Sequence, residues 1–247
     1  MRFFISAALA AILFAATGPS PAEAEEEVDL ELVLLADASG SIDDAEIKFQ
    51  RLGYAAAITH PQVLAAITHG FTQRIALTYV EWGDETSQEI VVPWTIIDGE
   101  ASAAVFANAL LTEPRRAYGF NAIGSALAAG QVLIEGNDIS GIRKVIDFSA
   151  DSANNFGGIP VETARALAVD SGIIINGLAI LCRETECSGQ PNLYDLEAAF
   201  AATIIGGPGA FVVTVDGRTS FAEAVRRKLV LEIASPMTRF ASGRAIR

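Results

Sequence analysis

The sequence predicts an α/β fold: a doubly wound, mostly parallel β-sheet with helices on both faces and one antiparallel strand at an edge. Three observations support this fold class. Runs with strand character alternate with segments of helical apolar spacing along most of the chain. Several strand runs are continuously apolar, as in strands that are buried on both faces. The polar segment 82–87 separates two β-rich runs, so these runs should form a hairpin that adds the antiparallel strand.

The elements can be assigned in chain order. The first strand, 30–36, is a short apolar run that ends in the polar turn 37–41. The helix that follows, 43–59, has apolar residues at helical spacing, and Ser41 is expected to be its N-cap. Pro61 should begin a second helix, because proline suits the first helical position. Further strands are expected at 74–81, 88–97, 143–148, 173–180 and 210–215, and further helices at 61–67, 101–111, 122–135, 160–171, 193–202 and 221–233.

Composition is consistent with one globular domain that does not bind nucleic acid. Of the 247 residues, 51% are hydrophobic and 19% are charged, which supplies a large core and argues against disorder. The formal net charge is −13, so the surface repels phosphate backbones and anionic lipid but is compatible with metal cations. We expect a signal peptide at 1–24, an acidic leader at 25–29, the domain at 30–234 and a C-terminal tail at 235–247.

The N-terminal segment has the organisation of a secretory signal peptide. Arg2 precedes an apolar run, 3–16, and Ala22 and Ala24 form a small-x-small cleavage site after two prolines. The other interpretation is a membrane anchor, but the run is too short to span a bilayer comfortably. We therefore expect an exported protein, periplasmic or extracellular, with no stable membrane anchor and with its mature chain beginning at Glu25.

The two cysteines are expected to form a disulfide in an oxidising compartment. Cys182 and Cys187 are close in sequence, so the bond would close a short loop. Two free thiols on a loop are the alternative. A zinc site is disfavoured, because His60 and His69 lie far away in sequence.

The most informative motif is an Asp-x-Ser-x-Ser turn between the first strand and the first helix. Asp37, Ser39 and Ser41 place one carboxylate and two hydroxyls around a tight turn that Gly40 allows. In an open α/β sheet, ligands bind beyond the carboxyl ends of the strands. Hard oxygen donors at this density suit Mg²⁺, Mn²⁺ or Ca²⁺. The alternative is an ordinary capped helix start, since Asp and Ser are common turn and cap residues.

Two later segments have a similar placement. Asn121 lies just before the Ala-rich helix, and Asp151 follows the strand 143–148. Asp37 and Asp151 together would neutralise a divalent cation. Asp147, inside that strand, should be buried and therefore needs a partner. It either braces the metal loops from behind or accepts hydrogen bonds from neighbouring backbone amides.

On these residues the chain resembles a von Willebrand factor type A (VWA) domain, a Rossmann-like α/β fold, over roughly 28–233. The family's metal-ion-dependent adhesion site (MIDAS) has an Asp-x-Ser-x-Ser turn, a Thr on a second loop and an Asp after a later strand. Asp37, Ser39, Ser41 and Asp151 match this pattern, whereas Asn121 stands where Thr is expected. The segments 145–151, 175–180 and 205–211 also resemble an uncharacterised bacterial exported group of VWA-like proteins, a resemblance that implies the fold and no function.

The resemblance implies a non-enzymatic binding module whose divalent cation engages a carboxylate of an unknown protein partner. A structural module without metal is the alternative, and Asn121 favours it. A metal-dependent hydrolase is a third possibility in which Asp147 and the ion activate water. It is disfavoured because the sequence lacks a Gly-x-Ser-x-Gly elbow, a His-Glu-x-x-His motif and an evident general base near the turn.

Overall fold

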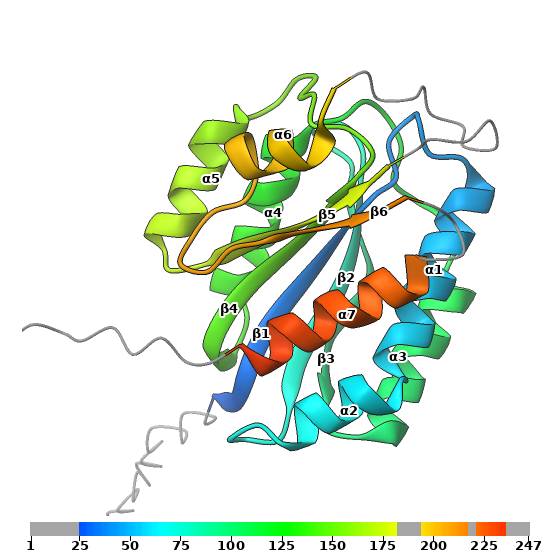
Figure 1. The fold of residues 1–247 in the computed structure, drawn as a ribbon, viewed down its shortest axis with the longest axis vertical. Helices are drawn as coiled ribbons and strands as arrows, with labels where there is room; N and C mark the ends of the chain where they lie inside the picture. The colour runs from blue at the N-terminus through cyan, green and yellow to red at the C-terminus, as the bar shows by residue number, and fades with distance from the viewer. Residues whose placement is uncertain (1–24, 182–193, 217–220, 236–247) are drawn as a thin grey trace, which may run out of the picture.

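The computed structural model describes residues 25–181, 194–216 and 221–235. Within them, a six-stranded sheet has the strand order β3-β2-β1-β4-β5-β6 (Figure 1). The strands are β1 (Glu26–Asp37), β2 (Ile75–Trp82), β3 (Gln88–Ile97), β4 (Ile139–Ala150), β5 (Ile174–Ile180) and β6 (Val212–Val215). The helices are α1 (Asp44–Ile58), α2 (Pro61–Thr68), α3 (Glu100–Thr112), α4 (Ile123–Glu135), α5 (Val161–Asp170), α6 (Leu196–Thr203) and α7 (Phe221–Ala234).

The sheet has the predicted doubly wound architecture. β1 pairs in parallel with β2 and β4, the β4–β5 and β5–β6 pairs are also parallel, and β3 is an antiparallel edge strand. Helices α1, α2, α3 and α7 cover one face, and α4, α5 and α6 cover the other (Figure 1). The predicted fold class is therefore confirmed. Because β1 and β4 are parallel neighbours in the middle of the sheet, their carboxyl ends meet at one edge.

The first strand begins earlier than its apolar pattern indicates. β1 starts at Glu26, where it pairs with Ile139 at the start of β4. Acidic residues that we expected to form a leader are thus part of the ladder. Glu26 is exposed, and its Oε1 forms an ion pair with Arg74 Nη1 at 3.0 Å. The hydrogen bonds between strands are made by the backbone, so a solvent-exposed strand end can carry charged side chains. A search for apolar runs therefore misses such a strand end.

The N-cap of α1 is Asp43, so the prediction that Ser41 caps this helix is wrong. Asp43 Oδ1 accepts a hydrogen bond from the Glu46 N–H at 2.8 Å, and Glu46 Oε2 accepts one from the Asp43 N–H at 3.0 Å. This reciprocal capping box satisfies amides of the first helical turn. The Ser41 hydroxyl instead contacts Asp151 at the end of β4.

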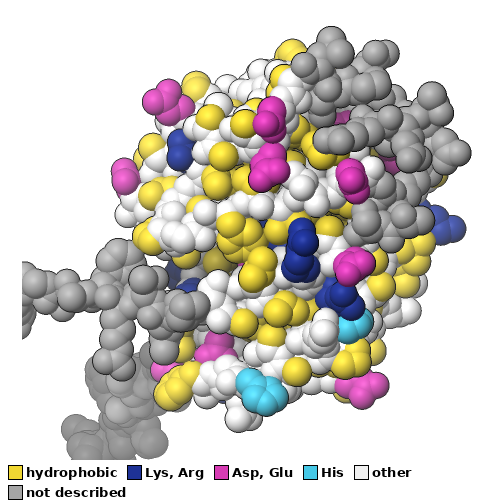
Figure 2. Space-filling model, viewed as in Figure 1, with side chains coloured by type: hydrophobic (Ala, Val, Ile, Leu, Met, Phe, Trp, Pro, Cys, Tyr) yellow, Lys and Arg dark blue, Asp and Glu magenta, His cyan; other side chains and the backbone are white. Residues whose placement is uncertain are grey.

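Buried hydrophobic side chains form a core on each face of the sheet. On the α1–α7 face, the Tyr54 and Tyr79 rings meet edge-on, with centroids 5.3 Å apart. On the α4–α6 face, Trp82 and Phe148 stack at 5.0 Å. The surface over α7 and α2 is mixed, with hydrophobic, acidic and basic side chains interspersed (Figure 2). Over the described ranges, none of the helices has both the length and the hydrophobicity to cross a bilayer.

A buried ion pair fastens the first helix to the sheet and to α3. Arg51 Nε lies 2.7 Å from Glu81 Oε1, and both side chains are almost wholly buried. The same guanidinium donates hydrogen bonds to the carbonyl oxygens of Leu110, Glu113 and Pro114 at the end of α3. Buried charges need partners of this kind to be tolerated. The ion pair thus fixes the middle of α1, the helix that follows the Asp-x-Ser-x-Ser turn.

Candidate metal site

The Asp-x-Ser-x-Ser turn lies directly after β1, and hydrogen bonds hold its backbone. Asp37 is fully buried, and its Oδ1 accepts the Ser39 N–H at 2.8 Å. The Asp37 carbonyl oxygen accepts a hydrogen bond from Gln50 Nε2 at 3.1 Å. The Gly40 N–H donates to the Gly119 carbonyl oxygen at 2.7 Å, which joins the turn to the segment that carries Asn121. These hydrogen bonds therefore join the turn to α1 and to the segment before α4.

Asp151 faces this turn from the end of β4. The Ser39 and Ser41 hydroxyl oxygens are 3.4 Å apart, and Ser41 Oγ donates to Asp151 Oδ1 at 3.2 Å. The approach follows from strand register, since Ala36 of β1 pairs with Ser149 of β4. Both carboxylates predicted to hold the ion therefore lie at the same edge of the sheet.

Asn121 is brought to this edge by the loop before α4. Its side chain is largely buried, and its Oδ1 has no hydrogen-bond partner within the described part of the protein. Its backbone carbonyl accepts the Phe156 N–H, and the adjacent Ala122 N–H donates to the Gly83 carbonyl at 2.9 Å. The loop is thus tied to the segments after β4 and β2. The structure assembles all three segments that the sequence singled out.

Electrostatics at the strand ends favour a bound cation. Burial, and then the neighbouring Asp151 carboxylate, raise the pKa of Asp37 to about 7. The pKa of Asp151 is also raised, first by burial and then by the Glu46 carboxylate, against a lowering contribution from the Ser41 hydrogen bond. Two buried carboxylates side by side are unfavourable unless a proton or a cation shares them.

The donor set fits a hard divalent ion. Asp37 Oδ2 is buried and, like Asn121 Oδ1, has no hydrogen-bond partner within the described residues. Two carboxylates, two hydroxyls and one amide oxygen match the oxygen preference of Mg²⁺, Mn²⁺ and Ca²⁺. Among the described residues, no group of three or more His, Cys, Asp or Glu side chains could hold a metal ion. Ser39, Ser41 and Asn121 are the neutral oxygen donors that would complete a set with the two carboxylates.

Asp147 is not held as the sequence analysis expected. Its Oδ1 lies 2.7 Å from the Nζ of Lys228, and both side chains are buried. Lys228 Nζ also lies 2.6 Å from Glu232 Oε1, which accepts a further hydrogen bond from Asn176 Nδ2 at 2.9 Å. We call Asp147, Asn176, Lys228 and Glu232 the buried charged cluster. Asp147 therefore pairs with α7 instead of with the metal loops or adjacent amides, because its side chain projects toward the face that α7 covers.

Several residues that support the site were missed from sequence. Gln50 is a polar residue on the buried side of α1, a pattern that could have revealed its role. Arg115 had no such signal: its Nη2 donates to the Ala38 carbonyl at 2.7 Å and its Nη1 pairs with Asp44 at 2.9 Å. Asn155 Oδ1 accepts the Gly124 N–H at 3.2 Å, which ties the segment after Asp151 to the start of α4. Cys182, Cys187 and the signal segment 1–24 lie outside the described residues.

Comparisons with solved structures identify the fold. The pilus adhesin SpaC from Lactobacillus rhamnosus GG has 12% identity and a TM-score of 0.59, with 83% of this chain and 31% of that chain covered. Proximal thread matrix protein 1 from the mussel byssus, in a structure with a zinc-occupied MIDAS motif, has 16% identity and a TM-score of 0.60, with 85% and 49% covered. The chain thus spans only a third to a half of these two proteins.

A third similar structure is a single domain. The vWF domain of the type V pili tip protein Mfa5 from Porphyromonas gingivalis has 10% identity and a TM-score of 0.51, with 82% of this chain and 94% of that chain covered. At such identities the likeness establishes the fold alone, and it confirms the expected VWA architecture. No curated protein sequence matches the chain.

A family model assigns the chain by sequence. The model described as "Protein of unknown function (DUF1194)" matches residues 27–237. The matched range includes the whole sheet after its first residue and all of the candidate metal ligands. The chain is therefore a member of the DUF1194 family of proteins of unknown function, and its domain has the fold of a von Willebrand factor type A domain.

Proposed function

We propose that this protein is an exported binding module that holds a divalent cation and uses it to bind a carboxylate of a protein partner. The ligands are Asp37, Ser39, Ser41, Asn121 and Asp151. The observation that carries the proposal is the fully buried Asp37 carboxylate, whose Oδ2 has no hydrogen-bond partner among the described residues and which lies beside Asp151. A cation between these carboxylates removes their mutual repulsion and gives the buried oxygen a partner.

The chemistry of this donor set suits carboxylate capture. Asp37 and Asp151 balance the charge of a divalent ion, and Ser39, Ser41 and Asn121 supply neutral oxygens. A carboxylate from outside can then replace a water ligand, because hard cations favour anionic oxygen. Mussel thread matrix protein 1 with a zinc-occupied MIDAS motif and the manganese-loaded TRAP protein of Plasmodium vivax support a cation in this fold.

The proposal also includes export and a protein partner. The similar structures include a pilus adhesin, a pilus tip protein and a byssus matrix protein, which supports a partner outside the cytoplasm. Cleavage after Ala24 would release a mature chain beginning at Glu25, and Cys182 and Cys187 would form their disulfide in that oxidising compartment. Mass spectrometry of the exported protein, with thiol labelling, tests both expectations.

Metal titration tests the proposed site. Calorimetry on the exported protein should give saturable binding of Mn²⁺, Mg²⁺ or Ca²⁺, and Asp37→Ala should abolish it. Asp170→Ala is the matched control, since Asp170 is exposed at the end of α5. Binding unchanged by Asp37→Ala would place the ion elsewhere in the protein.

A structural module without metal is the second candidate, because Asn121 occupies the position where the family pattern has Thr. On that alternative, millimolar Mn²⁺, Mg²⁺ or Ca²⁺ produces neither heat nor thermal stabilisation. Asn121→Thr then separates two causes. If Asn121 alone prevents metal binding, the substitution should restore it, and if other residues prevent it, the variant should also fail to bind.

A further inference from the structure

Large apolar side chains are exposed on the loops around the candidate metal site. Phe120 is 75% exposed, Phe156 59% and Tyr118 54%, and Ile159 and Tyr194 are also exposed. We call these five residues the apolar rim. Exposed apolar residues scattered singly need no explanation, but a group gathered at one place marks an interaction surface. Aromatic residues in particular are enriched where proteins bind other proteins.

Hydrogen bonds place the members of the apolar rim beside the metal ligands. Phe120 precedes Asn121, and the Asn121 carbonyl accepts the Phe156 N–H. Tyr118 and Phe120 flank Gly119, whose carbonyl oxygen accepts the Gly40 N–H of the metal loop.

The remaining two members belong to the same edge. Tyr194 Oη accepts the Ala153 N–H at 2.9 Å, two residues after Asp151. Ile159 ends the same loop, and its N–H donates to Ser125 Oγ in the first turn of α4 at 3.3 Å. The rim is therefore drawn from three segments that meet at the carboxyl ends of the strands.

The rim side chains are exposed although their backbones are held. The Tyr118 N–H donates to Ser87 Oγ at 3.0 Å, and the Arg115 guanidinium lies 4.6 Å from the Tyr118 ring centroid. The Gly158 N–H, next to Ile159, donates to Glu85 Oε2 at 3.1 Å. Aromatic anchors on a fixed backbone lose little conformational entropy when a partner covers them.

An apolar surface around a cation selects a particular kind of ligand. The ion attracts a carboxylate, and the apolar groups that close over that carboxylate exclude water and strengthen its attraction to the ion. The chain's net charge of −13 disfavours an anionic lipid surface as the occupant. We propose that the apolar rim is the docking surface for a protein segment that presents Asp or Glu between apolar side chains. This inference rests on the proposed function and specifies its partner.

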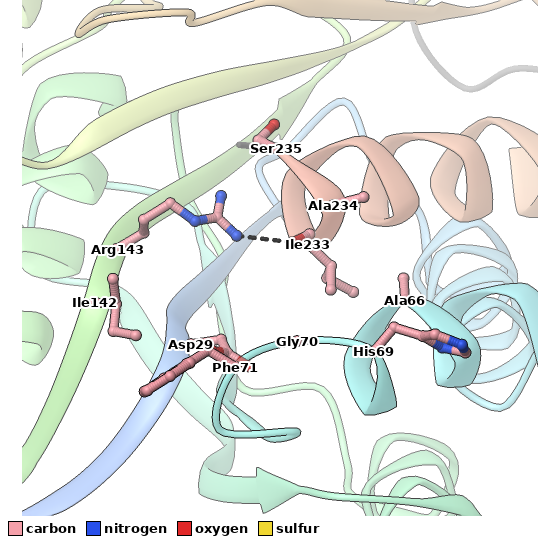
Figure 3. Close-up of a pocket in the computed structure, with 10 residues that line it drawn as sticks. All are labelled: Asp29, Ala66, His69, Gly70, Phe71, Ile142, Arg143, Ile233, Ala234 and Ser235. Atoms are coloured by element: carbon pink, nitrogen blue, oxygen red, sulfur yellow. Dashed lines mark hydrogen bonds between the residues drawn. The ribbon is translucent and has the colours of Figure 1, made fainter. Parts of the chain in front are cut away.

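The opposite end of the sheet supplies a matched control. Phe71 is 81% exposed and lines a cavity of about 340 Å³ with Asp29 at the start of β1 and Ser235 after α7 (Figure 3). Arg143 also lines this cavity. Its guanidinium donates hydrogen bonds to the Glu232 and Ile233 carbonyl oxygens and thereby caps the C-terminal end of α7. Phe71→Ser therefore removes an exposed phenyl ring of the same kind far from the metal ligands.

Three cyclic peptides of equal length test the inference. One presents Leu-Asp-Phe, the second Ser-Asp-Ser and the third Leu-Asn-Phe, and binding to the exported protein is measured with saturating Mn²⁺ and with chelator. We expect Leu-Asp-Phe to bind at least about tenfold more tightly than Ser-Asp-Ser, and Leu-Asn-Phe not to bind. The double variant Phe120→Ser, Phe156→Ser should bring the first two peptides to equal affinity, whereas Phe71→Ser should leave their ratio unchanged. The ratio is the readout because a loss of metal would weaken both peptides alike.

The outcomes separate the two proposals. If both Asp peptides bind equally and only with metal, the rim is not a docking surface and the proposed function stands. If neither Asp peptide needs the metal, the proposed function fails, and the inference fails with it. Binding to vesicles of phosphatidylethanolamine and phosphatidylglycerol is measured as well, to test a membrane as the occupant of the rim. Metal-dependent vesicle binding that the double variant abolishes, with equal affinity for the two Asp peptides, would assign the rim to a membrane.

Discussion

Ser41 Oγ donates a hydrogen bond to Asp151 Oδ1 at 3.2 Å, across 110 residues of sequence. The bond links the turn after β1 to the end of β4, and it exists because these strands are parallel neighbours. The Ser41 hydroxyl offsets part of the cost of burying the Asp151 carboxylate. The Asp37 carboxylate, buried beside Asp151, should therefore cost folding stability even though the proposed cation site requires it.

Asp37→Asn should stabilise the metal-free protein while abolishing metal binding. The amide keeps an Oδ1 acceptor for the Ser39 N–H and removes a buried charge that lies beside Asp151. At pH 8 with chelator, urea denaturation should show a gain of about 1 to 3 kcal/mol in the free energy of unfolding. A loss of stability would mean that the Asp37 charge is already compensated without metal.

Asn121 should set both the affinity and the choice of cation. Asn121→Ala removes a buried amide oxygen that has no other partner in the described structure, and it should weaken binding about tenfold. Asn121→Thr should shift preference toward Mg²⁺ and Mn²⁺, because the shorter hydroxyl suits a compact octahedral shell. Calorimetry with all three cations measures both effects. Asn154→Ala, an exposed neighbour in the loop after Asp151, should change nothing.

Lys228→Met should be strongly destabilising. Lys228 is the cation of the buried charged cluster, at 2.7 Å from Asp147 and 2.6 Å from Glu232. Without it, two buried carboxylates face each other, and the free energy of unfolding should fall by about 3 to 5 kcal/mol. Arg74→Met is the control, since its pair with Glu26 is exposed and should contribute less than about 1 kcal/mol. Similar losses for both variants in urea denaturation would contradict this reading of the cluster.

Glu232→Gln should remove part of the pH dependence of stability. Burial, and then the Asp147 carboxylate, raise the pKa of Glu232 to about 7, with Lys228 opposing the shift. The folded state therefore holds a proton that the unfolded state releases near pH 4.5, so this group's contribution to stability is lost as pH rises toward 7. Between pH 5 and pH 7.5, the wild type should lose about 1 to 3 kcal/mol more than Glu232→Gln.

The Glu232→Gln variant should change the pH dependence of stability without breaking hydrogen bonds around α7. The variant keeps an Oε1 acceptor for Asn176 and Lys228, so its hydrogen bonds are retained. The Arg143 guanidinium is also close enough for Glu232 to affect its pKa, but it remains a cation over this pH range. Glu223→Gln, an exposed position on the same helix, is the control. Parallel pH profiles for Glu232→Gln and the wild type would rule out a proton held on Glu232.

Gly124→Ala should destabilise the protein although alanine is the better helix former. A methyl group at Gly124 would overlap the Ile159 carbonyl oxygen, so the loop after Asp151 must move. Helix propensity alone would raise the free energy of unfolding by about 1 kcal/mol, whereas the clash should lower it by about 2 kcal/mol. Thermal or urea denaturation with chelator measures the difference. Gly99→Ala, at the N-cap of α3, meets no atom within 4 Å and should cost less than about 1 kcal/mol.

The sequence by itself determined the fold class and the residues to examine. Alternating strand and helix patterns predicted the doubly wound sheet, and the turn 82–87 predicted the antiparallel edge strand. Asp37, Ser39 and Ser41 could be found because they are close in sequence at the end of an apolar run. Strand ends near 26 and 139 were harder to place, since ladder hydrogen bonds do not require apolar side chains.

Only the tertiary structure decided which distant residues share an environment. Asp147 could be predicted to be buried, but its partner Lys228 comes from a helix whose position over the sheet depends on packing. Arg115 supports the Ala38 carbonyl from a loop that has no local signal. The apolar rim likewise consists of residues from three segments that look unrelated in sequence. Burial and charge pairing depend on the summed geometry of all strands and helices, so local patterns predict elements and candidate ligands but not the contacts between them.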